Sequence, residues 1–158
     1  ITSSSDAGAT FSKPVIVSDD KWVLQGCPVS GPSLALGEDG VLKVLWYAAG
    51  EGNAPGLYFA ESKNKGQSFS PRQLLAQESV RGTPVLAGGN ANLAIWEMTG
   101  GAAAETKFRK LGTDGPAASV GTNAELPAAA VSRDGLFVVY IAKEKEKRSV
   151  WLVKADQK

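Results

Sequence analysis

The sequence contains no histidine and a single cysteine, and each absence excludes a kind of site. Without histidine there is no Ser–His or Cys–His nucleophile pair, no His-ligated zinc or haem, and no histidine acid–base catalysis. With Cys27 alone, the chain cannot form an internal disulfide or a cage of thiolate ligands. We therefore expect no metal and no cofactor, and we interpret Cys27 as a small buried residue.

The chain also lacks an excess of charge and a long apolar run. Seventeen basic and sixteen acidic residues give a net charge of +1, which offers no electrostatic reason to bind nucleic acid or a membrane surface. The run KEKEKR (143–148) alternates in sign and is typical of a solvated loop. No apolar stretch approaches the ~20 residues that span a bilayer. The sequence opens at Ile1 without Met or a signal peptide, so we expect a mature, trimmed or excised segment.

A repeated pattern of strands is present instead. Three segments begin with a proline followed by small apolar residues, at Pro32, Pro84 and Pro127. Each leads, after a turn, into an apolar run containing an aromatic residue 14, 12 or 13 residues after the proline. The proline-to-proline periods of 52 and 43 residues resemble those of propeller blades.

The composition of these runs predicts β-strands throughout. VLKVLWY and LFVVYIA are nearly continuous apolar runs, as in strands buried on both faces, whereas TKFRKL alternates polar and apolar residues. Gly, Pro, Asn and Asp bound each run. The 158 residues are therefore expected to form one all-β domain, with no convincing helical stripe.

Two polar turns share one pattern, and we interpret both as structural. Their members follow the order Ser-x-Asp/Asn-x-Gly-x-Thr/Ser-Phe: Ser4, Asp6, Gly8, Thr10, Phe11; Ser62, Asn64, Gly66, Ser68, Phe69. The glycine supplies a positive φ, and the Asp or Asn accepts hydrogen bonds from downstream N–H groups. We expect Phe11 and Phe69 to be buried beneath the hairpins, with Ser5 and Lys63 exposed.

This pattern resembles the Asp box of bacterial sialidases and related β-propellers. WVLQGCPVSGPSLAL (22–36) is similar to a segment that joins two blades in exported, sialidase-like proteins. The resemblance implies four-stranded antiparallel blades, a periplasmic or secreted location, and a functional face opposite the boxes. On this template, residues 1–18 end one blade, 19–76 and 77–120 form two more, and 121–158 give three strands of a last one.

About three blades are present, whereas a propeller ring has typically four to eight. We therefore expect half of a six-bladed ring, and a chain that is not a free-standing monomer. The missing part is either the remainder of the propeller or a second copy. In one alternative, the strand KPVIV (13–17) pairs beside SVWLVKA (149–155) and closes a small ring.

The functional face of such a propeller contains the connections between blades. Trp22 and Tyr47 are candidates for stacking on a sugar ring, although both also fit the core of a blade. Arg81 is a candidate for holding a carboxylate, and Glu97 a candidate acid or supporting carboxylate. Ordinary surface or ion-paired roles remain open for both.

No catalytic set is identifiable in this chain. Sialidases, by the resemblance, need three converging arginines, and of the five here only Arg81 is predicted at a channel-facing position. We therefore expect an exported binding or interaction module, with its ligand, a glycan or another protein, undefined. The alternative is a sialidase-type glycoside hydrolase whose site is shared with a missing half.

Overall fold

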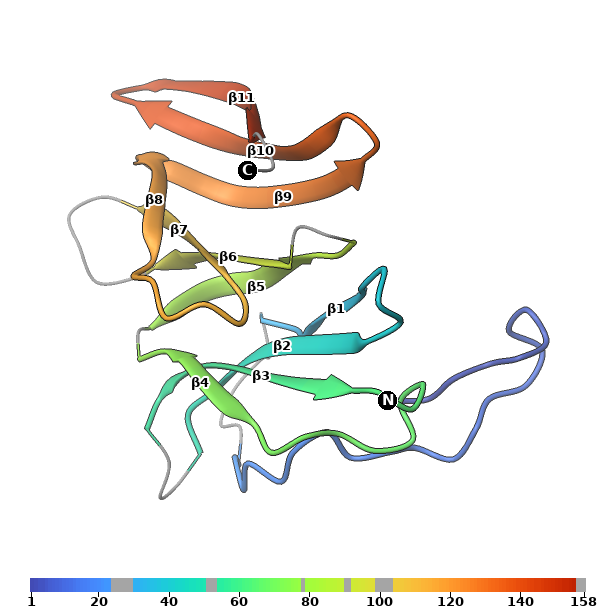
Figure 1. Cartoon of the computed structure of the whole chain (residues 1–158). Coiled ribbons are helices and arrows are strands. Elements are labelled where there is room, and N and C mark those ends of the chain that lie inside the picture. Colours follow the sequence, from blue (N-terminus) through green and yellow to red (C-terminus); the bar gives the residue numbers. More distant parts are fainter. Residues whose placement is uncertain (24–29, 51–53, 78, 90–91, 99–103, 156–158) are drawn as a thin grey trace.

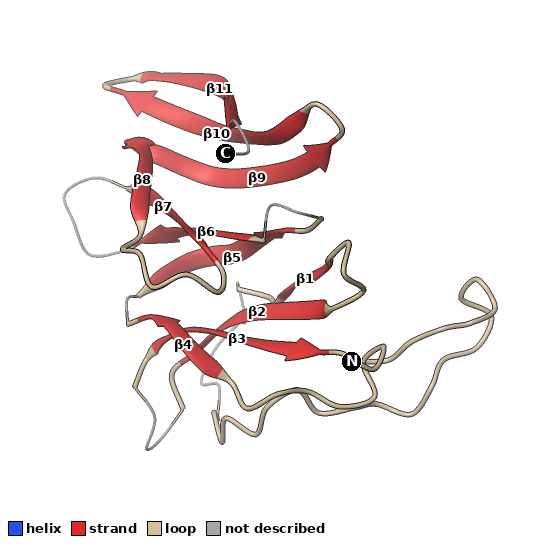
Figure 2. Cartoon of the chain, in the orientation of Figure 1, coloured by secondary structure: helices blue, strands red, loops and turns tan. Residues whose placement is uncertain are grey.

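The structure is a computed structural model, and it describes residues 1–23, 30–50, 54–77, 79–89, 92–98 and 104–155. These residues form strands, turns and loops, and none of them is helical (Figure 2). The strands build three antiparallel sheets that lie over one another in chain order (Figure 1). All three are meanders, in which each strand pairs with the next one along the chain.

The strand bounds follow the three repeats of the sequence. The first sheet has the order β1-β2-β3-β4: Ser33–Leu36, Leu42–Ala48, Gly56–Ser62, Gln73–Ala76. The middle sheet has the order β5-β6-β7-β8: Val80–Ala87, Leu93–Met98, Glu105–Lys110, Ala118–Thr122. The third sheet contains β9-β10-β11: Ala124–Ser132, Gly135–Glu144, Lys147–Ala155. The predicted all-β fold of propeller blades is confirmed, including a last sheet of three strands.

The first strands of successive sheets lie next to each other and run in the same direction. The Ser30 hydroxyl donates to the Gly82 carbonyl at 2.5 Å, and the Thr83 hydroxyl accepts from the Gly31 N–H at 3.1 Å. Further along, the Leu86 N–H donates to the Ser33 hydroxyl at 2.9 Å. Side chains therefore join β1 to β5, in the arrangement of inner strands around a propeller axis.

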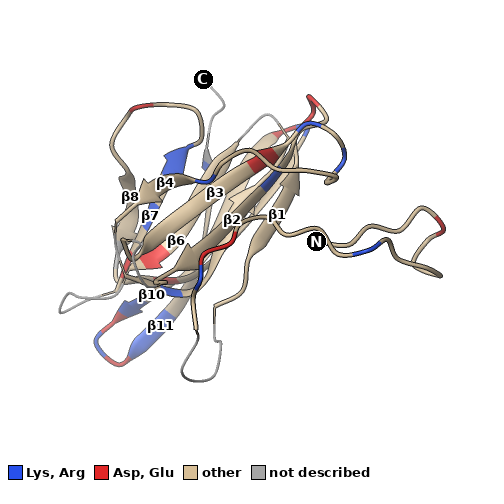
Figure 3. Ribbon diagram, turned by 90° about the horizontal axis from the view of Figure 1, so that it is seen from below, with Lys and Arg blue, Asp and Glu red and all other residues tan. Residues whose placement is uncertain are grey.

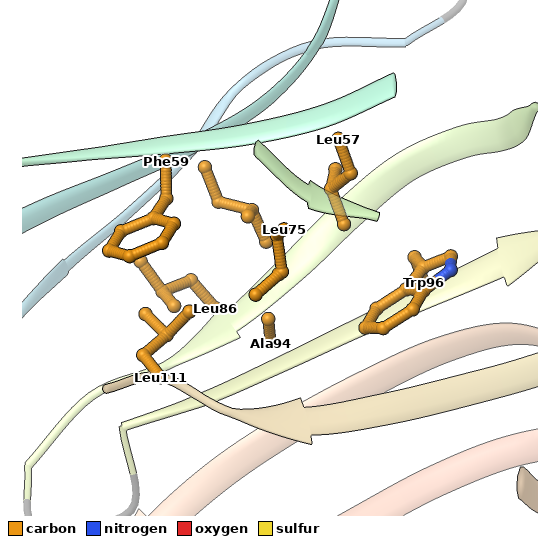
Figure 4. Close-up of a cluster of buried hydrophobic side chains, with 8 residues drawn as sticks. Leu57, Phe59, Leu75, Leu86, Ala94, Trp96 and Leu111 are labelled. Atoms are coloured by element: carbon orange, nitrogen blue, oxygen red, sulfur yellow. The ribbon is translucent and has the colours of Figure 1, made fainter. Parts of the chain in front are cut away.

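The largest core lies between the first and middle sheets (Figure 4). Leu57, Phe59 and Leu75 of the first sheet point toward Leu86 and Trp96 of the middle sheet. Leu57 and Trp96 have no exposed surface. A second cluster, containing Leu93, Ile95, Leu136 and Val138, joins the middle sheet to the third. The middle sheet is thus covered on both faces, which is why β6 is almost continuously apolar.

The two repeated turns have nearly the same hydrogen bonds. The Ser4 hydroxyl accepts the Gly8 N–H, and Asp6 accepts the N–H and the hydroxyl of Thr10, at 2.8, 2.9 and 2.6 Å. In the second turn Ser62 and Asn64 make the matching backbone contacts. Gly8 and Gly66 adopt φ of 92° and 82°, which a residue with a side chain rarely adopts. The hydrogen bonds predicted from the pattern are present.

The expected burial of both phenylalanines is wrong for Phe11. This side chain is 64% exposed, while Phe69 is partly buried and Ser5 and Lys63 are exposed as expected. The physical reason is the sheet beneath each turn. The turn at 62–69 connects β3 to β4 and lies on the first sheet, whereas the turn at 4–11 lies on a two-segment hairpin that reaches away from the sheets (Figure 1).

The N-terminal residues lie against the first sheet and not beside β11. The amine of Ile1 donates to the Val15 carbonyl at 2.8 Å, and the Val15 N–H donates to the Ile1 carbonyl at the same distance. Figure 1 places this segment on the opposite side of the stack from β11. The small ring closed by 13–17 and 149–155 within one chain is therefore not formed.

Leu57→Ala should destabilise the fold strongly, because Leu57 is fully buried between two sheets. Truncations of this kind cost about 2–5 kcal/mol in free energy of unfolding. Val23→Ala is the control, since Val23 is 80% exposed, and it should change stability by less than about 0.5 kcal/mol. Urea unfolding measures both; equal effects would contradict the assigned core.

Asp6 should remain ionised in unusually acidic solution. The Thr10 hydroxyl, the Thr10 N–H and the Ser4 hydroxyl lower the pKa of Asp6 from 3.8 to about 2. Because the folded pKa is depressed, the turn's stabilisation is present above about pH 4 and is lost as the pH falls through 2. An NMR titration should place the Asp6 midpoint near 2, and a midpoint near 3.8 would contradict the turn geometry. Asp6→Asn, which copies Asn64, should remove this titration.

Candidate functional site

The two ends of the sheets carry different features. At one end lie the turn between β1 and β2 and the Ser62–Phe69 turn, since Leu42 pairs with both Leu36 and Ser62. At the other end lie the connections between sheets and the loops that follow β2, β6 and β10. The structure places Trp22, Tyr47, Arg81 and Glu97 at this second end, which we call the connection end.

Arg81 and Glu97 are paired across neighbouring strands. They stand opposite each other in β5 and β6, and Arg81 Nη1 lies 3.5 Å from Glu97 Oε1. The two side chains differ sharply in exposure, with 62% for Arg81 and 3% for Glu97. The buried carboxylate thus forms an ion pair with a guanidinium that is largely exposed to solvent. Sequence reasoning identified each residue separately but not their pairing.

Glu97 also connects the middle sheet to the third one. Its Oε2 accepts the N–H of Leu126, in β9, at 3.0 Å. Its Oε1 is buried and receives no hydrogen bond from the part of the chain that the structure describes. Thr106, opposite Glu97 in β7, is buried as well and donates to the Ala124 carbonyl at 2.7 Å. Glu97 is therefore an acceptor with one oxygen engaged by backbone and one facing Arg81.

A β-bulge sets the position of Arg81. The register between β5 and β6 shifts between Arg81 and Val85, and Gly82 adopts a φ of 66°. A bulge of this kind locally re-aims the strand and often lies beside a functional site. The signal in the sequence is the Gly of RGTP, one residue after Arg81.

Trp22 and Tyr47 contact each other. Their ring centroids are 5.9 Å apart and the rings are nearly perpendicular, at 81°. Both line a cavity of about 360 Å³ together with Asp20, Ser30 and Trp46. Since Ser30 is hydrogen-bonded to Gly82, this cavity and Arg81 border the same β1–β5 contact.

Asp20 is a polar residue that sequence reasoning missed. Its carboxylate accepts the indole N–H of Trp46 at 2.6 Å and pairs with Arg72. The Arg72 guanidinium lies over the Tyr58 ring, 4.5 Å from its centroid. These contacts attach the N-terminal connection to the outer face of the first sheet. The signal was the acidic pair in SDDKW, at the point where a connection reaches a sheet.

The other arginines have different environments. Arg109 donates to the Leu75 and Thr113 carbonyls at 3.0 and 2.8 Å, which joins the first two sheets. Arg133 is exposed in the turn between β9 and β10. Arg148 lies at the connection end, in the β10–β11 hairpin where basic and acidic residues alternate (Figure 3). Arg81, also at the connection end, is paired with the buried Glu97 carboxylate.

Metal-ligating residues do not gather into groups of three or more among the described residues. The described residues likewise contain no helix long and apolar enough to cross a membrane.

Comparisons with known proteins show similarity of fold. No family model matches the chain, and no curated protein matches it. A crystal structure of a protein of unknown function from Dyadobacter fermentans is similar, with a TM-score of 0.58 and 15% identity, over 94% of this chain and 43% of that one. A mannose phosphorylase from Leishmania mexicana, MPT-4, aligns with a TM-score of 0.44 and 14% identity, over 80% of this chain and 42% of that one. This chain thus spans less than half the length of either protein.

Removing Arg81 should lower the free energy of unfolding, because it leaves the buried Glu97 carboxylate without a cation beside it. Arg81→Ala removes this cation and should destabilise the fold by about 1–2 kcal/mol, a value reduced by the exposure of Arg81. Adding Glu97→Gln should restore most of the loss, because the uncompensated charge is gone. Urea unfolding of both variants measures this, and additive losses in the double variant would contradict the pairing.

Proposed function

We propose that this chain is part of an exported, sialidase-like β-propeller that acts as a binding or protein-interaction module. Two features support the family. The turns at Ser4–Phe11 and Ser62–Phe69 combine the Asp-box pattern with matching hydrogen bonds. The sheets are arranged as blades, with parallel inner strands joined by side-chain hydrogen bonds.

The observation that carries a binding role is the exposed guanidinium of Arg81 on a buried carboxylate. Orienting a long side chain in advance lowers the entropy that a ligand must otherwise supply. Glu97 Oε1 lies 3.5 Å from one nitrogen of the Arg81 fork, and the side chain of Arg81 is 62% exposed, so N–H donors of the fork are accessible to a ligand. A planar anion, above all a carboxylate, is the ligand that such a fork fits best.

The aromatic pair suggests which anions fit. Trp22 and Tyr47 lie at the same end of the sheets and line the cavity beside the β1–β5 contact. Aromatic surface next to a cation suits a ligand with an apolar ring face and a negative charge. An acidic sugar, such as a sialic acid at the end of a glycan, has both properties.

A hydrolase is the second candidate, and Glu97 is the observation that favours it. Its Oε1 is buried without a hydrogen bond in the described part of the chain, beside the cation that would hold a substrate. By the family resemblance, however, a sialidase also needs two further converging arginines, and Arg72 and Arg109 are engaged in contacts between or within sheets. The remaining groups would have to come from another part of the propeller.

The module further needs a partner that covers the outer face of its third sheet and the exposed part of the outer face of its first sheet, around Leu34. The remainder of a propeller or a second chain would fill this role. A periplasmic or secreted location follows from the family resemblance. We place the blade boundaries at residues 18, 76 and 120.

Binding of free N-acetylneuraminate tests the proposal. We expect saturable binding by isothermal calorimetry or NMR shift mapping, with an affinity reduced about tenfold or more in Arg81→Ala, since a charge-assisted hydrogen bond contributes about 1.5–3 kcal/mol. Arg133→Ala is the matched control, because Arg133 lies exposed at the opposite end of the sheets. It should leave the affinity unchanged.

Two results would count against this function. Equal loss of affinity in both arginine variants would indicate binding through general charge. Release of 4-methylumbelliferone from its sialoside by the purified chain, abolished by Arg81→Ala, would favour the hydrolase. We expect no such release from this chain alone.

A further inference from the structure

Leu126 has a backbone conformation that leucine rarely adopts. It stands in β9, one residue before Pro127, with a φ of 51°. This left-handed conformation is costly for a bulky residue, because Cβ comes close to the carbonyl oxygen that follows it. Among the described residues, the others that have a side chain and a positive φ are alanine, asparagine or lysine: Ala7, Lys21, Lys65, Asn92, Asn123, Lys145. Leu126 is therefore the one bulky apolar residue that this part of the chain holds in a left-handed conformation.

The unusual conformation belongs to a β-bulge. Leu126 and Pro127 together stand opposite Tyr140, because the register between β9 and β10 shifts there. The bulge in β5 offers a comparison, since it also lies at the connection end and its residue at positive φ is Gly82. Glycine is the usual residue at the left-handed position of a bulge. Leucine in β9 thus keeps a side chain at a place where glycine would remove the strain.

Buried groups of the middle sheet hold Leu126 in place. Its N–H donates to Glu97 Oε2 at 3.0 Å, and Glu97 is 3% exposed. Two residues earlier in β9, the Ala124 carbonyl accepts the hydroxyl of Thr106 at 2.7 Å, and neither residue has exposed surface. Glu97 and Thr106 stand opposite each other in β6 and β7. The start of β9 is therefore attached to the middle sheet at two points, which offsets the strain at Leu126.

The Leu126 side chain is largely exposed, at 64%, and it belongs to the same site as Arg81. The two oxygens of Glu97 have different neighbours: Oε2 accepts the Leu126 N–H, and Oε1 lies 3.5 Å from Arg81 Nη1. One buried carboxylate thus stands between the guanidinium and the leucine backbone. Oε1 receives no hydrogen bond from the described residues. A strained residue and a buried oxygen of this kind are both features that cluster at functional sites.

We propose that Leu126 is a specificity-determining residue of the anion site, and that the ligand is an acidic sugar with an apolar group next to its carboxylate. Arg81 binds the carboxylate, and Leu126 adds an apolar contact that a ligand gains only with a matching apolar group. A lactyl ether of a sugar fits, because the carbon next to its carboxylate carries a methyl group. In a uronic acid, that carbon belongs to a hydroxylated ring. This inference rests on the proposed binding function at Arg81.

Two probes that differ by one methyl group test this specificity. N-Acetylmuramate carries a lactyl ether, and 3-O-carboxymethyl-N-acetylglucosamine is the same compound without the methyl group. In NMR titrations, we expect the unchanged chain to bind the lactyl ether about fourfold more tightly, the factor that one buried methylene group contributes. Leu126→Asn should abolish this preference, because asparagine tolerates the left-handed conformation but is not apolar. Leu126→Met, which keeps an apolar side chain, should retain it.

A matched control and a stability measurement separate specificity from packing. Leu36→Asn is the control, because Leu36 is 63% exposed at the opposite end of the sheets, and it should leave the ratio of the two affinities unchanged. Leu126→Gly should not lower the urea midpoint of unfolding, since glycine adopts a positive φ without strain. A midpoint that falls as far as that of Leu57→Ala would show that Leu126 serves packing, and would overturn the proposal.

The binding results distinguish this inference from the proposed function. If both probes bind and Arg81→Ala weakens both, the binding function stands. The role of Leu126 is then wrong if the unchanged chain does not prefer the lactyl ether, or if Leu126→Asn keeps the preference. Binding of N-acetylneuraminate with neither probe bound also refutes the role of Leu126 and leaves the binding function in place. Absence of binding by all three compounds overturns both.

Discussion

The fold depends on one constraint, that each sheet has two apolar faces and must cover both. The middle sheet meets it, with Trp96 and Leu86 against the first sheet and Ile95 against the third. The third sheet is covered on one face only, and N-terminal residues cover part of the outer face of the first sheet, where Val44 is buried and Leu34 is 55% exposed. At about 25 cal/mol per Å² of apolar surface, an uncovered face forfeits stabilisation that is comparable to a small domain's whole stability. The open faces are therefore the feature that decides what else must be present.

Much of the fold was predictable because it follows from local patterns. The three prolines predicted the first strand of each sheet, and the aromatic residues that follow them predicted the second. Gly8 and Gly66 predicted turns that need a positive φ. Burial was less predictable, because it depends on what lies over a residue. Trp46 and Trp96 stand in matching contexts, yet only Trp96 is fully buried. The predicted burial of Phe11 was wrong for the same reason, since its turn lies on a hairpin that reaches away from the sheets.

In the candidate site, too, the residues were predictable from local patterns but their contacts were not. The sequence pointed to Arg81 and Glu97 individually, at strand ends where functional residues gather. Their pairing depends on the register of β5 against β6 and on the bulge at Gly82, neither of which a single sequence specifies. The bond from Leu126 to Glu97 comes from a third strand, far along the chain. Contacts between sheets thus hold the side chain on which the binding proposal depends.

The side-chain hydrogen bonds between β1 and β5 have a consequence for motion. Because the middle sheet lies between the other two and packs on both, opening can begin at either end of the stack and proceed one sheet at a time, as in repeat arrays. Backbone amides of β6, covered on both faces, should exchange with deuterium only through global unfolding, whereas those of β11 should exchange through local opening. Ser30 and Ser33 join the first sheet to the middle one by hydrogen bonds. The backbone amides of β1 should therefore exchange more slowly than expected for a strand at the end of the stack. Exchange rates would therefore reveal a gradient of protection from the centre of the stack outward.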